Sequence, residues 1–205
     1  MCAFFNSQDE EYRVLAPFFQ EGLGWGEKVM HIVDPARIDQ HLRQLRAHGI
    51  DTEGCQKCGQ LEVLGWNDVY LNGGSFDQQR MLGAIDGALQ AGKDAGYPRM
   101  RIMGNMGWTL EGKPGTDQVL EFEAGVNEVL THWRQPAVCV YDLSKLSGSM
   151  MMDILRSHPL TLVGEIVHEN PFYEPATQLL EKFRQQRSGK PMAATTATAA
   201  NPASA

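Results

Sequence analysis

The amino-acid sequence predicts an α/β fold with three layers, in which helices cover both faces of a central, mostly parallel sheet. Two observations lead to this prediction. Short runs rich in Val, Ile or Phe are apolar on successive positions, as expected of strands that are buried on both faces. Segments with apolar residues at helical spacing separate these runs, and strands that alternate with helices in this way form parallel sheets.

Six apolar runs are the expected strands. We expect the last of them to form a single strand. In chain order the runs are Cys2–Phe5, Val29–Val33, Leu61–Leu64, Arg101–Met103, Ala137–Tyr141 and Leu160–Val167.

Capping residues and glycines set the boundaries of the expected helices. Ser7–Glu10 and Ser75–Gln78 both have the capping-box pattern that opens a helix. Asp34–Pro35 combines an N-cap with a proline in the first turn. Gly49 and Gly96 follow apolar stripes and are the expected ends of two helices. Three further helices are expected from apolar stripes at Val119, Phe122, Val126, Leu130 and Trp133, at Met151, Ile154 and Leu155, and at Leu179, Leu180 and Phe183.

Composition and charge restrict the classes of function. The chain has 205 residues, of which 42% are hydrophobic and 21% charged, as is ordinary for a globular protein. Its net charge is −7 and its Lys and Arg residues are scattered, which argues against direct binding of nucleic acid. No apolar stretch approaches the roughly 20 residues of a transmembrane helix, and the N-terminus does not resemble a signal peptide. We therefore expect a cytoplasmic protein that does not contact a membrane.

A change in composition after Arg187 predicts the domain boundary. Residues 188–205 read SGKPMAATTATAANPASA, and Met192 is their only large apolar residue. We expect one domain over residues 1–187, followed by a disordered Ala/Thr/Pro-rich tail over residues 188–205.

The stretch Gly22–Lys28, GLGWGEK, looks at first like a loop that binds phosphate. A Walker A loop reads GxxxxGK[ST] and lies between a strand and a following helix. Here Glu27 separates the last glycine from the lysine, and Val29 stands where a Ser or Thr is required. A helix also precedes the glycines and a strand follows them. We therefore interpret the stretch as the turn that ends the first helix.

Two cysteines, Cys55 and Cys58, stand at the C-x-x-C spacing in GCQKCG. One such pair supplies half of a structural zinc site, which needs four ligands, and the sequence holds no second pair. We expect the pair in a loop before a strand, where it lacks the helix N-terminus that lowers the pKa of a redox thiol. Two free thiols are favoured, while a zinc site shared across a homodimer remains an alternative.

Polar residues follow two of the expected strands where they end. Asn105 and Trp108 lie beyond the fourth strand in RIMGNMGWTLEG, and Asp142 ends the fifth in VCVYD. In open α/β sheets ligands bind outside the carboxyl ends of the strands, so these residues are candidates for binding a small organic ligand. Trp108 packed over the sheet and Asp142 in a turn are the alternatives. Asp34 ends another strand and is expected to be a helix cap.

The histidines do not form a catalytic set. His158 and His168 flank the last expected strand without a serine in an elbow motif, and His31 is expected in the core. The sequence therefore predicts neither an enzyme nor a cofactor.

Three stretches together resemble a known family. They are CAFFNSQDEEYRVLAPFFQEGLGWGEKVMHIVD, GYPRMRIMGNMGWTLEG and AVCVYDLSKLSGSMMMDILRSHPLTLVGEIVHENPFYEP. Their order and spacing are similar to those of the MEDS domain, the methanogen/methylotroph DcmR sensory domain, over residues 1–187. The sequence departs from the family pattern at Asn105, where a glutamate is common, and at Met1, because a histidine usually stands upstream of the cysteine.

The resemblance implies a RecA/KaiC-like core that has no P-loop, and a sensory role with hydrocarbon derivatives such as halomethanes as ligands. Asn6 and Ser7 stand where the P-loop of a RecA-like relative begins, so they join Asn105, Trp108 and Asp142 as candidate ligand-binding residues. We expect a stand-alone sensor that signals through a protein partner, such as a regulator or kinase, in transcriptional regulation. A divergent RecA-like ATPase and a ligand-free interaction module are the alternatives.

Overall fold

A computed structural model describes residues 1–187 of the chain. The expected tail over residues 188–205 lies outside the described part. Within it, seven strands form one sheet in the order β3-β2-β4-β5-β1-β6-β7, and every neighbouring pair is parallel except β6 and β7. The strands are β1 (Cys2–Phe5), β2 (Lys28–Val33), β3 (Leu61–Gly65), β4 (Met100–Asn105), β5 (Ala137–Asp142), β6 (Leu160–Val163) and β7 (Ile166–Glu169).

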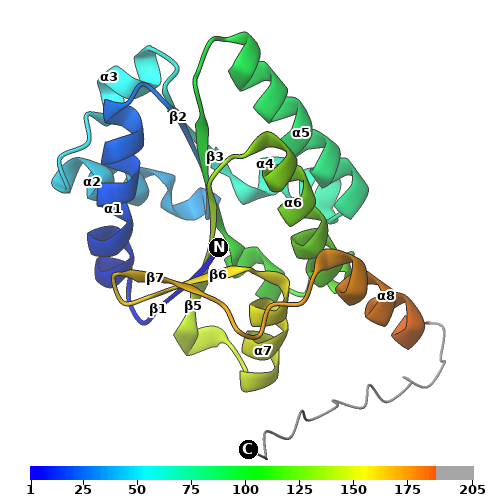
Figure 1. Ribbon diagram of the computed structural model, residues 1–205. Helices are drawn as coiled ribbons and strands as arrows, with labels where there is room; N and C mark the ends of the chain where they lie inside the picture. Colours follow the sequence, from blue (N-terminus) through cyan, green and yellow to red (C-terminus); the bar gives the residue numbers. More distant parts are fainter. Residues whose placement is uncertain (188–205) are drawn as a thin grey trace, which may run out of the picture.

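Helices cover both faces of the sheet, as the sequence predicted. Figure 1 shows α1, α2 and α3 on one side of the sheet and α5 and α6 on the other. The helices are α1 (Gln8–Gly24), α2 (Ile38–Ala47), α3 (Thr52–Lys57), α4 (Trp66–Val69), α5 (Gln78–Asp94), α6 (Val119–Trp133), α7 (Gly148–Ser157) and α8 (Ala176–Arg187).

The two faces of the sheet carry separate hydrophobic cores. On one face Leu15 and Phe19 of α1 and Leu45 of α2 pack on the sheet through residues such as Val29. The other core is richer in aromatic and methionine side chains and lies under α4, α5, α6 and α7. Central strands buried on both faces explain the continuous apolar runs of the sequence.

Several predicted boundaries are confirmed. Ser7 caps α1 and Asp34 caps the short helical turn before α2, each accepting a hydrogen bond from a backbone N–H. Gly49 and Gly96 follow the ends of α2 and α5 with φ near +86° and +87°, a conformation that suits glycine. The turn predicted at Gly22–Lys28 joins α1 to β2.

Three local predictions are wrong. Gly164, with φ of +60°, turns the chain within the last apolar run, so β6 and β7 form a hairpin instead of one strand. Asp77, and not Ser75, caps α5, because its side chain accepts the hydrogen bond from the backbone N–H of Arg80. The stretch with Cys55 and Cys58 is α3 and its C-cap, where a loop was expected. Asp51 caps α3 and so opens a helix in a short segment that lacks a clear apolar stripe.

No helix among residues 1–187 has the length and the apolar character needed to span a bilayer.

Candidate functional site

A cavity of about 310 Å³ opens where four neighbouring parallel strands, β2, β4, β5 and β1, reach their carboxyl ends. This volume lies at the lower end of the range for small-molecule sites. The walls combine apolar, aromatic and charged side chains. The polar and charged side chains that line the cavity include Ser7, Glu11, Tyr12, Asp34, Arg37, His41, Asn105, Asp142 and Lys145.

Polar capping residues surround this cavity. Asn105 Oδ1 accepts from the backbone N–H of Gly107 at 3.0 Å, and Asp142 Oδ1 accepts from that of Ser144 at 3.0 Å. Ser7 and Asp34 cap the turns after β1 and β2. Each strand therefore ends in a residue that turns the chain into a helix and places a polar group at the cavity.

The structure brings together three of the five residues predicted to bind a ligand. Ser7, Asn105 and Asp142 line the cavity, whereas Asn6 and Trp108 do not. Asn6 is exposed, and its backbone N–H donates to the Glu10 carboxylate at 2.9 Å. Trp108 is fully buried, with ring centroids 4.9 Å from Tyr70 and 4.7 Å from Phe76, and so packs in the aromatic core.

Sequence reasoning missed the groups that α1, α2 and the short helical turn before α2 point into the cavity. Glu11 and Tyr12 lie one turn beyond the Ser7 cap, and Arg37 and His41 lie one and two turns beyond Asp34. Their spacing from the capping residues could have identified these groups, because the first turn after each cap faces the strand ends.

Glu11 has the most perturbed carboxyl group of this cavity. Burial raises its pKa to about 7, the nearby Asp142 charge adds to the shift, and the Arg37 charge opposes it. Asp142 behaves in the opposite way. Burial acts to raise its pKa, but hydrogen bonds from Ser144 and Lys145 hold the pKa below its usual value. The cavity therefore presents a carboxyl group that is partly protonated near neutral pH beside one that stays ionised.

A chain of hydrogen bonds leads from the cavity into the core. The hydroxyl of Tyr12 lies 2.7 Å from His41 Nδ1, and His41 Nε2 lies 2.8 Å from His31 Nδ1. Burial lowers the pKa of His41 to about 4 and lowers that of His31 further below its usual value. Both rings are therefore neutral at pH 7. This series of hydrogen bonds thus places polar groups, but no charge, behind the cavity. His31 lies in the core, as predicted.

The loop after β1 stands where a P-loop is expected, but two of its backbone donors are bound to side chains of the same segment. Ser7 Oγ accepts from the backbone N–H of Glu10 at 3.2 Å, while the Glu10 carboxylate accepts from that of Asn6. This capping box uses two of the backbone donors near the N-terminus of α1, those of Asn6 and Glu10, and it places the Glu10 carboxylate beside them.

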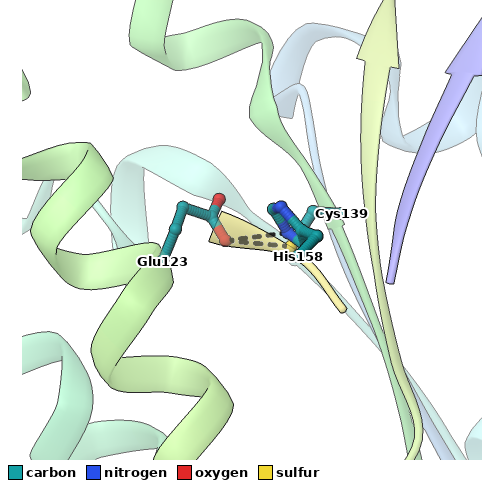
Figure 2. A group of neighbouring side chains, drawn as sticks. All are labelled: Glu123, Cys139 and His158. Atoms are coloured by element: carbon teal, nitrogen blue, oxygen red, sulfur yellow. Dashed lines mark hydrogen bonds and ion pairs between the residues drawn. The ribbon is translucent and has the colours of Figure 1, made fainter. Parts of the chain in front are cut away.

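A second group of functional side chains lies away from the cavity, between β5 and the helices α6 and α7. Figure 2 shows Glu123, Cys139 and His158 pointing toward one another. Glu123 and His158 are buried, and Cys139 is partly buried. Burial acts to raise the pKa of Glu123, but His158 and hydrogen bonds from His158, Tyr141 and Cys139 bring it below its usual value.

The cysteine pair named from the sequence lies elsewhere. Cys55 and Cys58 lie at the C-terminal end of α3, where the Cys58 thiol donates to the Cys55 carbonyl oxygen at 3.4 Å. Both are free thiols. In the described part of the chain, the group of three or more metal-ligating side chains that gathers is the one at Glu123, and it does not include this pair.

Comparison with known proteins decides the family. A family model described as the MEDS domain, the methanogen/methylotroph DcmR sensory domain, matches residues 1–159. The chain belongs to the MEDS family. This confirms the resemblance seen in the sequence and indicates a sensory or regulatory role. The expected domain end at residue 187 stays a prediction. β6, which follows the matched segment directly, pairs with β1 and so continues the sheet of this MEDS chain.

Two proteins of known description resemble this MEDS chain. It is 25% identical over 161 residues to the transcriptional repressor DcmR of Methylorubrum extorquens (strain DSM 6343 / CIP 106787 / DM4). The match covers 77% of this chain but only 57% of that repressor. The crystal structure of the KaiC-like protein PH0186 from Pyrococcus horikoshii OT3 superposes with a TM-score of 0.54 and 13% identity, over 78% of this chain and 68% of that one. The latter likeness concerns the fold and confirms the RecA/KaiC-like architecture.

Proposed function

We propose that this MEDS chain binds a small organic ligand in the cavity at the carboxyl ends of β1, β2, β4 and β5, and that a partner protein reads its bound state. The observation that carries the proposal is the position of the cavity in a sensory-family chain. It lies where α/β sheets bind ligands, and Ser7, Asn105 and Asp142 line it.

The walls of the cavity indicate the chemistry of the ligand. Phe5, Val33 and Met106 contribute apolar surface, while Glu11 and Asn105 offer hydrogen-bonding groups. A carboxyl group with a pKa of about 7 both donates and accepts hydrogen bonds near neutral pH. This combination suits a small, weakly polar molecule, as the sensory family implies, and a volume of about 310 Å³ suits a compact one.

A divergent ATPase is the alternative in the enzyme class. The cavity speaks against it, because Glu11, Asp34, Glu111 and Asp142 outnumber the lysine and arginine side chains that line it, and phosphate groups need positive charge or free backbone donors. The capping box uses two of the backbone donors near the N-terminus of α1, those of Asn6 and Glu10. We therefore propose that the role is not enzymatic.

A signal from the cavity needs an output surface, and the β6–β7 hairpin has the composition of one. Val163, Ile166 and Val167 are 59%, 62% and 49% exposed, which is unusual for neighbouring apolar side chains on a strand. β7 is also an edge strand in the described sheet. These features support the proposal that a partner protein binds the hairpin. The cavity favours a sensor over an interaction module without a ligand.

A thermal-shift screen of the purified chain tests the proposal. The probes are a halomethane, a short alcohol, a methylated amine and ATP with magnesium. A ligand present at 100 times its Kd stabilises the folded state by about 2.7 kcal/mol, which raises the melting temperature by several degrees.

A matched pair of variants locates the binding site. We expect Asn105→Ala to reduce the shift caused by an organic probe, and Asn72→Ala, at an exposed position outside the cavity, to keep it. Saturable binding of ATP with magnesium, and of no organic probe, would overturn the proposal in favour of the ATPase. No shift with any probe would favour the interaction module.

A further inference from the structure

The buried group formed by Glu123, Cys139 and His158 has a geometry that the ligand cavity does not explain. The three side chains come from α6, β5 and the residue after α7. One ligand atom from each lies within 4.8 Å of the other two. A carboxylate oxygen, a cysteine sulfur and an imidazole nitrogen are the three donor types that bind zinc in proteins.

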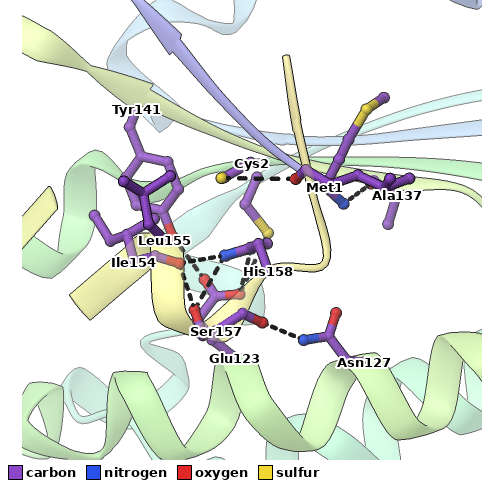
Figure 3. Close-up of polar contacts among 12 residues, drawn as sticks. Met1, Cys2, Glu123, Asn127, Ala137, Tyr141, Ile154, Leu155, Ser157 and His158 are labelled. Carbon is purple, nitrogen blue, oxygen red and sulfur yellow. Dashed lines mark hydrogen bonds and ion pairs between the residues drawn. The ribbon is translucent and has the colours of Figure 1, made fainter. Parts of the chain in front are cut away.

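Hydrogen bonds on the far side of the imidazole fix its tautomer. Figure 3 shows His158 beside Ile154 and Ser157 at the end of α7. His158 Nδ1 lies 2.9 Å from the carbonyl oxygen of Ile154. A carbonyl oxygen only accepts, so Nδ1 carries a proton, and in the neutral ring Nε2 then presents a lone pair to the group. A metal-binding histidine is held in this way when its other nitrogen donates to a backbone carbonyl.

Nε2 of His158 faces a carboxylate oxygen. Nε2 of His158 is 3.2 Å from Oε2 of Glu123, and the Sγ of Cys139 is 3.4 Å from the same oxygen. An attractive contact between two such electron-rich atoms needs a cation between them, either a proton, on Nε2 or on the carboxyl group, or a metal ion. Ligands bound about 2.0–2.3 Å from a tetrahedral zinc ion lie roughly 3.3–3.7 Å apart, close to both distances.

The second oxygen of the carboxylate is already oriented. The hydroxyl of Tyr141 donates to Oε1 of Glu123 at 2.9 Å, which leaves Oε2 directed at Cys139 and His158. Outer hydrogen bonds of this kind hold the ligands of protein metal sites in place. The neighbouring thiol of Cys2, which pairs with Cys139 in register across β1 and β5, points elsewhere and donates to the Leu160 carbonyl at 3.8 Å.

We propose that Glu123, Cys139 and His158 form a binding site for a zinc-like divalent metal ion, with Oε2, Sγ and Nε2 as its ligands and the fourth position left to water. Binding releases the thiol proton of Cys139 and any proton on Nε2. The site ties α6, β5 and the end of α7 together, and it is independent of the organic ligand proposed for the cavity. The rival description is a metal-free ion pair between Glu123 and a protonated His158, with the thiol donating to the carboxylate.

Metal analysis of the full chain separates the two descriptions. The protein is purified without chelators, its zinc content is measured, and Co²⁺ is then titrated into the metal-free form. We expect a stoichiometric amount of zinc and a thiolate-to-cobalt charge-transfer band in the near ultraviolet. Wild-type protein that takes up neither zinc nor cobalt would overturn the proposal.

Variants identify the ligands. We expect Cys139→Ser and Glu123→Gln to weaken zinc affinity by more than the roughly 10–100-fold that loss of an outer-shell partner costs. Cys2→Ser alters a buried thiol on the neighbouring strand and is the matched control, and Cys55→Ser with Cys58→Ser tests the pair on α3. Zinc retained in Cys139→Ser, or lost only with Cys2 or the α3 pair, would overturn the proposed ligand set.

An alkylation test on wild-type protein remains decisive if a variant fails to fold. The chain is treated with iodoacetamide with and without zinc, and the modified cysteines are identified by mass spectrometry. We expect zinc to protect Cys139 and to leave the exposed Cys58 reactive. Equal modification of Cys139 in both samples would contradict the site.

Discussion

The surroundings of a buried carboxyl group differ between the two ends of the parallel strands. We call the side where these strands begin the amino edge and the side where they end the carboxyl edge. At the amino edge Glu27 is 4% exposed, and its Oε2 accepts from Nε of the buried Arg101 at 2.5 Å. At the carboxyl edge Glu11 faces the cavity, and burial raises its pKa to about 7. At the amino edge an arginine neutralises the carboxylate and stabilises the fold. At the carboxyl edge the carboxyl group has no comparable partner for its negative charge. A site of that kind is where ligand binding is expected.

Further contacts at the amino edge neutralise or cover the charge of Arg101. Arg101 also pairs with Glu21 at 2.9 Å and lies over the rings of Phe18 and Trp25, at 4.4 Å and 5.4 Å from their centroids. The GLGWGEK stretch supplies Trp25 and Glu27 to this cluster. The segment that resembled a phosphate loop is thus a turn that carries part of the amino edge.

The largest effect is expected from breaking the amino edge. Arg101→Met leaves the buried Glu27 carboxylate without its main partner, which costs about 3–5 kcal/mol in the free energy of unfolding. Urea unfolding followed by circular dichroism measures this loss. Arg99→Met is the control, because Arg99 is half exposed, lies 3.6 Å from the same carboxylate and is expected to contribute at most about 1 kcal/mol. Equal effects of the two substitutions would refute the difference between the edges.

A smaller effect of opposite sign is expected at the carboxyl edge. The pKa of Glu11 is about 7 in the folded chain against 4.5 as its ordinary value, so folding disfavours the ionised form. The contribution of Glu11 to stability therefore falls as the pH rises from about 4.5 to about 7, and this loss is constant above that range. Glu11→Gln removes this titration and should stabilise the chain by about 1–3 kcal/mol at pH 8, but not at pH 4.

The difference between Glu11→Gln and wild type isolates this group, because all other titrations are common to both chains. Unfolding by urea at a series of pH values measures it. A difference that does not change between pH 4 and pH 8 would show that Glu11 is not perturbed.

The smallest effect is expected from the hydrogen-bond chain behind the cavity. Tyr12→Phe leaves Nδ1 of the buried His41 without the hydroxyl at 2.7 Å, which costs about 1–2 kcal/mol. Because the pKa of His41 is about 4, the loss should be the same at pH 6 and pH 8. Thermal unfolding at both pH values checks this expectation, and a loss confined to the lower pH would mean that His41 carries a charge.

Local patterns predicted most of the fold but only part of the candidate site. Apolar runs located the strands and so placed Asn105 and Asp142 at the strand ends, while the family resemblance pointed to Ser7 after the first strand. Gly164 was missed as a turn because apolar residues, Val163 before it and Ile166 and Val167 after Glu165, continue the run on both sides. Glu11 was missed because its surroundings come from other elements.

Contacts between distant segments were out of reach of sequence reasoning. Glu123, Cys139 and His158 come from separate elements, and only the packing of α6 and α7 against β5 brings them together. No local spacing in the sequence predicts such a group. The C-x-x-C pair, in contrast, is visible from its spacing alone. The same holds for the hydrogen bond between Tyr12 and His41, which joins two helices.

The central claim, that the carboxyl edge binds the ligand, is tested most directly by an NMR titration of the isotopically labelled chain with the same four probes. Backbone amide shifts report which edge responds. We predict that an organic probe shifts the amides of Ser7, Asn105 and Asp142 in a saturable manner and leaves those of Gly22–Lys28 at the amino edge unchanged. Shifts confined to the amino edge, or saturable shifts with ATP and magnesium alone, would contradict the account.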